Sequence, residues 1–165
     1  MALWKARRTL FLVGEGYHEK AFLNYVKHLY APRGCGLSVT VKCAGGKSAK
    51  HIIDWTARQI ANVAYDSVAV MLDTDTDWTP ALSKQAKAKR IQVLTSEPCF
   101  DALLLRLLKK HPVGDAAALK KQLASYLNND PTESQNYAEH FGRARLESGR
   151  KSEPSIDALL KLLNV

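Results

Sequence analysis

Two short acidic segments of this 165-residue chain contain the residues best suited to catalysis or metal binding. Glu15 and Glu19 lie in the segment GEGYHE, and Asp73, Asp75 and Asp77 alternate with threonine in the segment DTDTD. Carboxylates that lie close together repel one another and raise one another's pKa unless a cation neutralises them. Hard divalent cations take oxygen ligands of this kind. If the fold brings the two segments together, they predict a site for Mg²⁺ or Mn²⁺, with one or two ions bound.

Each acidic segment alone has a plainer interpretation. DTDTD could be a solvated turn or a helix cap, and Glu15 and Glu19 could be first-turn acids that favour a helix dipole. The occurrence of acids at the ends of two separate strands favours a site. The GGKS segment at 45–48 lacks the earlier glycine of a P-loop, because position 41 is Val. A lone His18 beside the acids is more often a surface residue than a catalyst.

The elements that must position these acids follow from hydrophobic patterning. Continuous apolar runs predict strands at 9–13, 37–41, 68–72 and 91–94. Helical spacing predicts helices between them at 17–30, 48–64 and 80–89. Strands without polar alternation are buried on both faces, as in a parallel sheet that helices cover. Open sheets of this class bind ligands at the carboxyl ends of their strands, which is where both acidic segments fall.

Three further expectations concern the arrangement of these elements. The first and third strands should be central neighbours, so that Glu15 and Asp73 lie side by side. Positions 73, 75 and 77 should point the same way if the segment is extended. After position 95 the chain becomes helical, with helices expected at 97–110, 115–127, 133–147 and 154–163. The prediction is an α/β domain with a small, four-stranded, mainly parallel sheet at 1–95 and a helical extension at 96–165 packed on it, in one compact domain.

Composition limits the class of protein. Hydrophobic residues make up 46% and charged residues 24%, which is ordinary for a globular protein and excludes disorder as the main state. No apolar run reaches the roughly 18 residues of a membrane span, and no signal-peptide core is present, so a cytoplasmic protein is expected. The odd number of cysteines, Cys35, Cys43 and Cys99, argues against a disulfide framework.

The charge balance suggests a polyanionic partner. The chain carries 24 Lys and Arg against 16 Asp and Glu, a net charge of +8. A basic balance is a feature of nucleic-acid-binding proteins, although it also occurs in proteins that bind no anion. The residues expected to hold a phosphate backbone are Lys84, Lys87, Lys89, Arg90, Lys109 and Lys110.

The two acidic segments together resemble the TOPRIM domain, which has a Glu-Gly after its first strand and an Asp-x-Asp after its third. The chain is most similar to the RloB-like and OLD-type nucleases of bacterial restriction and phage-defence loci. Three segments carry that resemblance: LFLVGEGYHEKAFLNYV at the start, SEPCFDALLL at 96–105 and SEPSIDALLKLL near the end.

The resemblance implies a role for each acid. Glu15 matches the catalytic glutamate, and Asp73 and Asp75 match the catalytic, metal-binding aspartates. Glu19 matches a second acid that helps to hold another metal, and Asp77 lies where some members place a further one. The chain departs from the subgroup's pattern with Glu97 and Asp101, in place of Asn and Glu; Glu97 either adds an acid to the site or caps a helix.

The function expected from these residues is metal-dependent cleavage of the phosphodiester bonds of nucleic acid. The metal would neutralise charge on the phosphate and activate water, with Glu15 as general base or ligand. The alternative is a non-catalytic subunit that binds nucleic acid, or joins a protein partner in a defence complex, and retains a metal site. A third option is another phosphoryl transfer on the same acids. The choice between RNA and DNA, and the oligomeric state, are left open.

Overall fold

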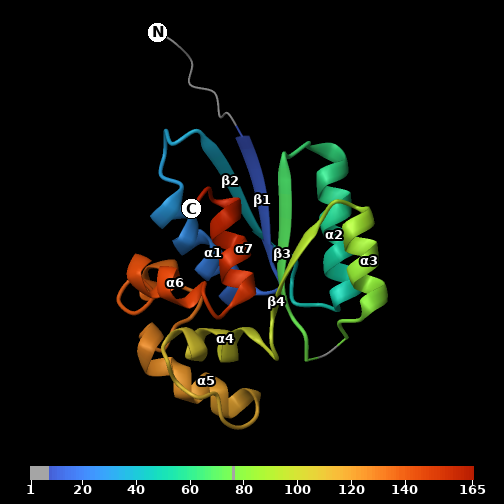
Figure 1. Ribbon diagram of the computed structural model, residues 1–165. Helices are drawn as coiled ribbons and strands as arrows, with labels where there is room; N and C mark the ends of the chain where they lie inside the picture. The colour runs from blue at the N-terminus through green and yellow to red at the C-terminus, as the bar shows by residue number, and fades with distance from the viewer. Residues whose placement is uncertain (1–7, 76) are drawn as a thin grey trace.

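The computed structural model describes residues 8–75 and 77–165. Strands and helices alternate up to Ser96, and the rest of the described chain is helical (Figure 1). The elements of the first part are β1 (Arg8–Gly14), α1 (Tyr17–Tyr30), β2 (Leu37–Cys43), α2 (Ala49–Asn62), β3 (Ser67–Asp73), α3 (Pro80–Ala88) and β4 (Gln92–Ser96). Those of the second part are α4 (Phe100–Leu107), α5 (Ala116–Ala124), the short 3-10 turns η1 (Ser125–Leu127) and η2 (Ser134–Tyr137), α6 (Arg143–Gly149) and α7 (Pro154–Leu162).

The four strands form one parallel sheet in the order β2-β1-β3-β4. Leu12 of β1 lies opposite Val41 of β2 on one side and Ala69 of β3 on the other. The α/β class and the central position of β1 and β3 are therefore confirmed. All four carboxyl ends lie at the same edge of the sheet, called here the carboxyl edge.

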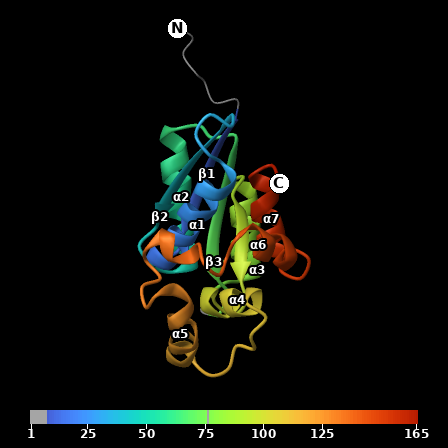
Figure 2. The same cartoon turned by 90° about the vertical axis from the view of Figure 1, so that its left-hand side faces the viewer.

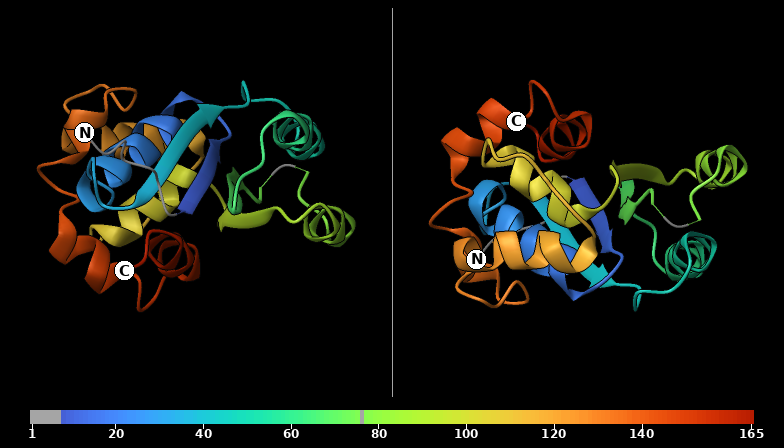
Figure 3. Two further views of the ribbon diagram at one scale, coloured as in Figure 1. Left: turned by 90° about the horizontal axis from the view of Figure 1, so that it is seen from above. Right: turned by 90° about the horizontal axis from the view of Figure 1, so that it is seen from below.

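Side chains alternate between two apolar cores, one on each face of the sheet. Leu10 and Leu12 of β1 lie in the core that α1, α4 and α7 cover, whereas Phe11 and Val13 lie in the core that α2 and α3 cover. Figure 3 shows the two groups of helices on opposite sides of the strands. The sheet is thus the middle of three layers, and its central strands are apolar along their length because both faces are buried.

The second part of the chain closes one face and the carboxyl edge. Helix α4 and helix α5 lie across the ends of the strands, and α7 lies beside β4 (Figures 1 and 2). Arg106 of α4 donates to both carboxylate oxygens of Glu153, just before α7, at 2.6 and 3.2 Å. Leu104 and Ile156 belong to the same buried core as Leu12. The helices after Ser96 are therefore joined to the sheet by a shared core.

Three expectations about the elements are wrong. The helix expected at 133–147 is two pieces, η2 and α6, with Gly142 as the N-cap residue of α6. The helix expected from position 97 begins at Phe100. The DTDTD segment is not extended, because β3 ends at Asp73 and the chain bends at the next two residues.

Within the described residues, no helix is long and apolar enough to cross a membrane.

Candidate metal centre

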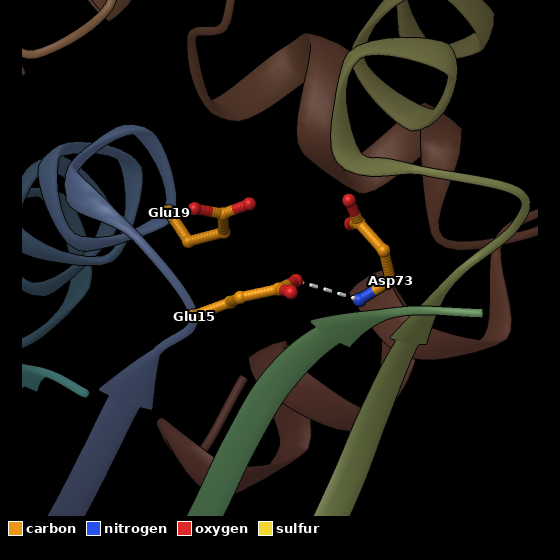
Figure 4. Close-up of side chains that lie close together, drawn as sticks. All are labelled: Glu15, Glu19 and Asp73. Atoms are coloured by element: carbon orange, nitrogen blue, oxygen red, sulfur yellow. Dashed lines mark hydrogen bonds between the residues drawn. The ribbon is translucent and has the colours of Figure 1, made fainter. Parts of the chain in front are cut away.

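Three carboxylates from separate parts of the sequence meet at the carboxyl edge. Glu15, Glu19 and Asp73 each offer one oxygen, and these oxygens lie within 4.8 Å of one another. Figure 4 shows the three side chains turned toward a common space between the start of α1 and the end of β3. Among the described residues, no lysine, arginine or histidine forms an ion pair with any of them. No described side chain therefore neutralises these carboxylates when they ionise.

Glu15 is placed by the pairing of the two central strands. It follows the last residue of β1, and its backbone N–H donates to the carbonyl of Met71 in β3 at 3.1 Å. Its side chain crosses to β3, where Oε2 accepts the backbone N–H of Asp73 at 3.0 Å (Figure 4). Glu15 and Asp73 are thus neighbours because β1 and β3 are.

Glu19 is placed by the first turn of α1. Its Oε2 accepts the backbone N–H of Gly16 at 3.0 Å, the interaction that a carboxylate makes in a capping box. Its side chain is only 7% exposed. The turn comes this close to β1 because residue 14 is glycine: a Cβ there would lie 2.7 Å from the backbone nitrogen of Lys20 and 3.0 Å from the Cβ of Glu19.

Asp73 is placed by the start of α4. Its Oδ1 accepts the backbone N–H of Phe100, the first residue of that helix, at 2.9 Å. The backbone N–H groups of Thr74 and Asp75 both donate to the carbonyl of Pro98, at 3.1 and 3.0 Å. These bonds join the loop after β3 to the loop after β4, and so fix the Asp73 carboxylate near the other two.

Burial and mutual repulsion keep these carboxyl groups from ionising easily. Burial is the main cause that raises the pKa of Asp73 to about 8, and the charges of Glu15 and Glu19 add to it. Burial likewise raises the pKa of Glu19 to about 7 and raises that of Glu15. A cation would reverse these shifts, because an opposite charge favours the ionised form. Three oxygen donors in a partly buried, unneutralised cluster fit a hard divalent cation.

The two remaining aspartates of DTDTD lie outside this cluster. Asp75 is exposed, and its charge helps to raise the pKa of Glu15 and of Asp73. Asp77 reaches to the start of α2, where its two carboxylate oxygens accept the backbone N–H of Ala49 at 3.2 and 3.0 Å. The charge of Asp77 also contributes to the raised pKa of Glu15. Asp77 therefore acts as a helix cap in this structure.

The other acids of the carboxyl edge have different surroundings. Glu97 is exposed, and Cys99 rather than Glu97 is the N-cap residue of α4. Asp101 lies in the first turn of α4, and burial raises its pKa while the nearby charges of His18 and Lys120 lower it. The sequence alone predicts no role for Asp101. The signal that could have found it is a single carboxylate within the apolar segment CFDALLL.

The six basic residues expected to hold nucleic acid do not form one surface. Lys84, Lys87, Lys89 and Arg90 lie along and after α3, which runs away from the carboxyl edge toward the start of β4 (Figure 1). Lys89 forms an ion pair with Asp54 of α2 at 3.0 Å. Lys109 and Lys110 follow α4, at the other end of the helix whose start holds Asp73. All six side chains are exposed, namely those of Lys84, Lys87, Lys89, Arg90, Lys109 and Lys110.

Comparison of the chain with protein-family models, with curated proteins and with solved structures found no match. The function must therefore be argued from the geometry of the site itself.

Proposed function

We propose that the protein is a metal-dependent nuclease that cleaves phosphodiester bonds at the carboxyl edge of its sheet. The observation that carries this proposal is the cluster of Glu15, Glu19 and Asp73, whose oxygens lie within 4.8 Å of one another without a basic partner among the described residues. The ionised form of such a cluster is unfavourable unless a cation occupies it. A site of this kind on a basic chain of net charge +8 suits a polyanionic substrate.

The three carboxylates have different roles in the proposed reaction. A divalent cation held by these acids would neutralise charge on the scissile phosphate and make water more acidic. Glu19 and Asp73, fixed by the N–H groups of Gly16 and Phe100, are the ligands whose orientation is set by helix starts. Glu15 is less buried than Glu19, and is the group suited to accept a proton from the attacking water.

The substrate's backbone would be held by exposed cations around the same edge. Lys109 and Lys110 are the expected binding residues that lie on the α4 side of the site, and α4 spans only about 12 Å at its ordinary rise per residue. The residues on α3 lie along a separate face and would serve a longer strand. The resemblance to the TOPRIM domain supports the same reaction, with Mg²⁺ or Mn²⁺ as the metal. It also supports a role for the protein in phage defence.

The decisive experiment is incubation of labelled RNA and DNA with the protein, with and without Mg²⁺ or Mn²⁺. We expect metal-dependent cleavage that Glu15→Gln reduces by about 10²–10⁴-fold, the usual contribution of a general base. The matched control is Glu139→Gln, which removes an exposed carboxylate distant from the three acids in sequence and leaves them intact. Binding of the same strands should survive Glu15→Gln and weaken steeply with salt.

Two results would contradict the proposal. If the parent binds metal and nucleic acid but cleaves neither RNA nor DNA, the protein is the non-catalytic binding subunit. If Asp73→Asn and the parent bind Mn²⁺ with the same affinity by calorimetry, the acid cluster is not a metal centre at all. Circular dichroism of each variant separates these results from a loss of fold.

A further inference from the structure

A cavity of about 240 Å³ lies between the start of α1 and helices α4 and α5. Its walls are largely apolar, with Leu123, Leu127 and Pro131 among the residues that line it. Three ionisable side chains also line it: His18, Asp101 and Lys120. A concave apolar site with a few polar groups is the usual form of a small-ligand pocket.

Asp101 is the unusual member of this lining. Its side chain is only 9% exposed, and no described residue donates a hydrogen bond to its carboxylate. Its carboxylate oxygens are not fully enclosed by protein, and they are open to a donor that enters the cavity. Lys120 and His18 lie close enough for their charges to favour the ionised carboxylate. The cavity thus offers an acceptor and adjacent donors to a ligand.

The cavity adjoins the metal centre through two pairs of consecutive residues. Asp101 follows Phe100, whose N–H donates to the Asp73 carboxylate at 2.9 Å. His18 precedes Glu19 in the first turn of α1. The charge of Asp101 also acts on Glu19, whose pKa it helps to raise, so the two sites are near each other in space. A ligand whose phosphate binds at the three acids would have this cavity beside it.

We propose that this cavity binds a guanine base, with the Asp101 carboxylate accepting the two adjacent N–H groups of its Watson–Crick edge and Lys120 donating to its O6. The inference rests on the proposed nuclease function, because it names the base next to the phosphate at the metal centre. Leu123, Leu127 and Pro131 cover the faces of the ring. Enzymes that read an unstacked base use this combination of edge hydrogen bonds and apolar packing.

The donor pattern selects guanine among the common bases. Guanine presents a ring N–H and an amino group side by side, which a carboxylate accepts in parallel. Adenine and cytosine place an acceptor nitrogen next to their amino group, and that nitrogen would face the carboxylate. Uracil and thymine present one N–H between two carbonyl groups. Pockets for drug-sized ligands measure about 300–1,000 Å³, so a cavity of about 240 Å³ suits a single base.

The test is a titration of the ¹⁵N-labelled full-length protein, without divalent metal, with guanosine, inosine and adenosine 5′-monophosphates. Inosine lacks the amino group of guanine, so the guanosine nucleotide should bind about 5- to 100-fold more tightly than either of the others. Its resonance shifts should centre on the residues of the cavity. Asp101→Asn should abolish the preference, and the exposed Lys120→Gln should weaken guanosine binding without affecting the fold. Lys121→Gln, at the neighbouring exposed position, is the matched control.

A second arm uses single-stranded oligonucleotides of uridine that contain one guanine or one inosine. Preference for guanine in both arms supports the site, and preference in only one arm identifies whether free nucleotide or a base within a strand is the natural occupant. Equal binding of all three nucleotides together with equal binding of both oligonucleotides overturns the inference, whether or not the protein cleaves. Guanosine preference in a protein that cleaves nothing overturns the nuclease proposal and leaves the cavity assignment standing.

Discussion

Each carboxylate of the candidate metal centre accepts a hydrogen bond from a backbone N–H. Glu15 accepts from Asp73, Glu19 accepts from Gly16, and Asp73 accepts from Phe100. A neutral donor orients a carboxylate without cancelling its charge, whereas an arginine or lysine would do both. The backbone therefore orients the three carboxyl groups without neutralising the charge that they carry when ionised.

The cost of ionising the buried Asp73 carboxyl group predicts an unusual dependence of stability on pH. The pKa of Asp73 is about 8 in the folded protein, above the unfolded value of about 3.9. The folded state then binds more protons than the unfolded state between these two values, so the free energy of unfolding falls as pH rises from about 4 to 8. Removing the Asp73 carboxylate should remove the part of this fall in unfolding free energy that its ionisation causes. In EDTA, we expect Asp73→Asn to be about 1–2 kcal/mol more stable than the parent at pH 8 and close to it at pH 4.

Urea unfolding of both proteins across this pH range is the measurement. The amide introduced by Asp73→Asn keeps a carbonyl oxygen that can accept the Phe100 N–H, so the comparison isolates charge from hydrogen bonding. Parallel curves for the two proteins would show that Asp73 is not held in an unfavourable state.

Gly14 should control the affinity of the centre for metal although it offers no ligand. In Gly14→Ala the new methyl group would lie 2.7 Å from the backbone nitrogen of Lys20. A backbone atom cannot move aside as easily as the end of a flexible side chain. The first turn of α1 must shift and take Glu19 with it. We expect Mn²⁺ affinity to fall at least tenfold by calorimetry, a change of about 1.4 kcal/mol.

The control for this variant is Gly142→Ala, since no atom lies within 4 Å of a Cβ at that position. It should leave metal affinity unchanged. Equal Mn²⁺ affinity of Gly14→Ala and the parent would mean that Glu19 is not a ligand.

At the scale of elements, the two halves of the DTDTD segment serve different helices. Asp73 receives the first N–H of α4, and Asp77 receives the first N–H of α2. Ser48, the N-cap residue of α2, already accepts the N–H of His51. The start of α2 is thus satisfied by two side chains from different parts of the sequence.

Asp77→Ala should therefore lower stability rather than metal affinity. We expect a loss of about 0.5–2 kcal/mol in the free energy of unfolding, the usual effect of removing a helix cap. Calorimetry with Mn²⁺ should give the parent's affinity within about twofold, since a cap acts on folding. A large loss of Mn²⁺ affinity with unchanged stability would instead place Asp77 among the ligands, as the sequence analysis expected.

Most elements could be predicted because their apolar pattern is local. The strands at 9–13 and 68–72 are apolar almost throughout, and the structure extends each by one residue at either end. The helix expected at 133–147 fails because Gly142 lies in its middle, where glycine costs about 1 kcal/mol and readily begins a new helix. Tyr137 and Phe141 are buried just before that glycine, so tertiary packing determines the path.

The candidate site could be predicted only in part, because the decisive contacts are distant in sequence. Adjacent central strands sufficed to bring Glu15 and Asp73 together. The bend after Asp73 depends on hydrogen bonds from the N–H groups of Thr74 and Asp75 to the carbonyl of Pro98. The alternating pattern of the DTDTD segment gives no indication of these hydrogen bonds. The cavity beside Asp101 depends on Lys120 in α5, which no local motif connects to the acids.

At the scale of the whole molecule, one apolar core joins the sheet to the helices after Ser96. Leu12 and Met71 of the sheet lie in the same cluster as Leu103, Leu104 and Ile156. A fragment of residues 1–95 would expose that face of the sheet to water, at about 25 cal/mol for each Å² uncovered. We expect the fragment to show no cooperative thermal transition by circular dichroism, whereas the full chain does. A cooperative transition in the fragment would show that positions 1–95 form an independent domain.

The pairing of β1 with β3 also determines at which stage of folding the acid cluster can form. Glu15 and Asp73 are 58 positions apart, and they meet only after the chain has closed the long loop that contains β2 and α2. Contacts of high sequence separation slow folding, because loop closure costs entropy before it gains contacts. A nascent or unfolded chain offers a cation two separate local groups of acids, Glu15 with Glu19 and the aspartates of DTDTD, but not the combined cluster. The three-carboxylate cluster proposed to bind metal is therefore assembled only in a chain whose β1 and β3 have paired.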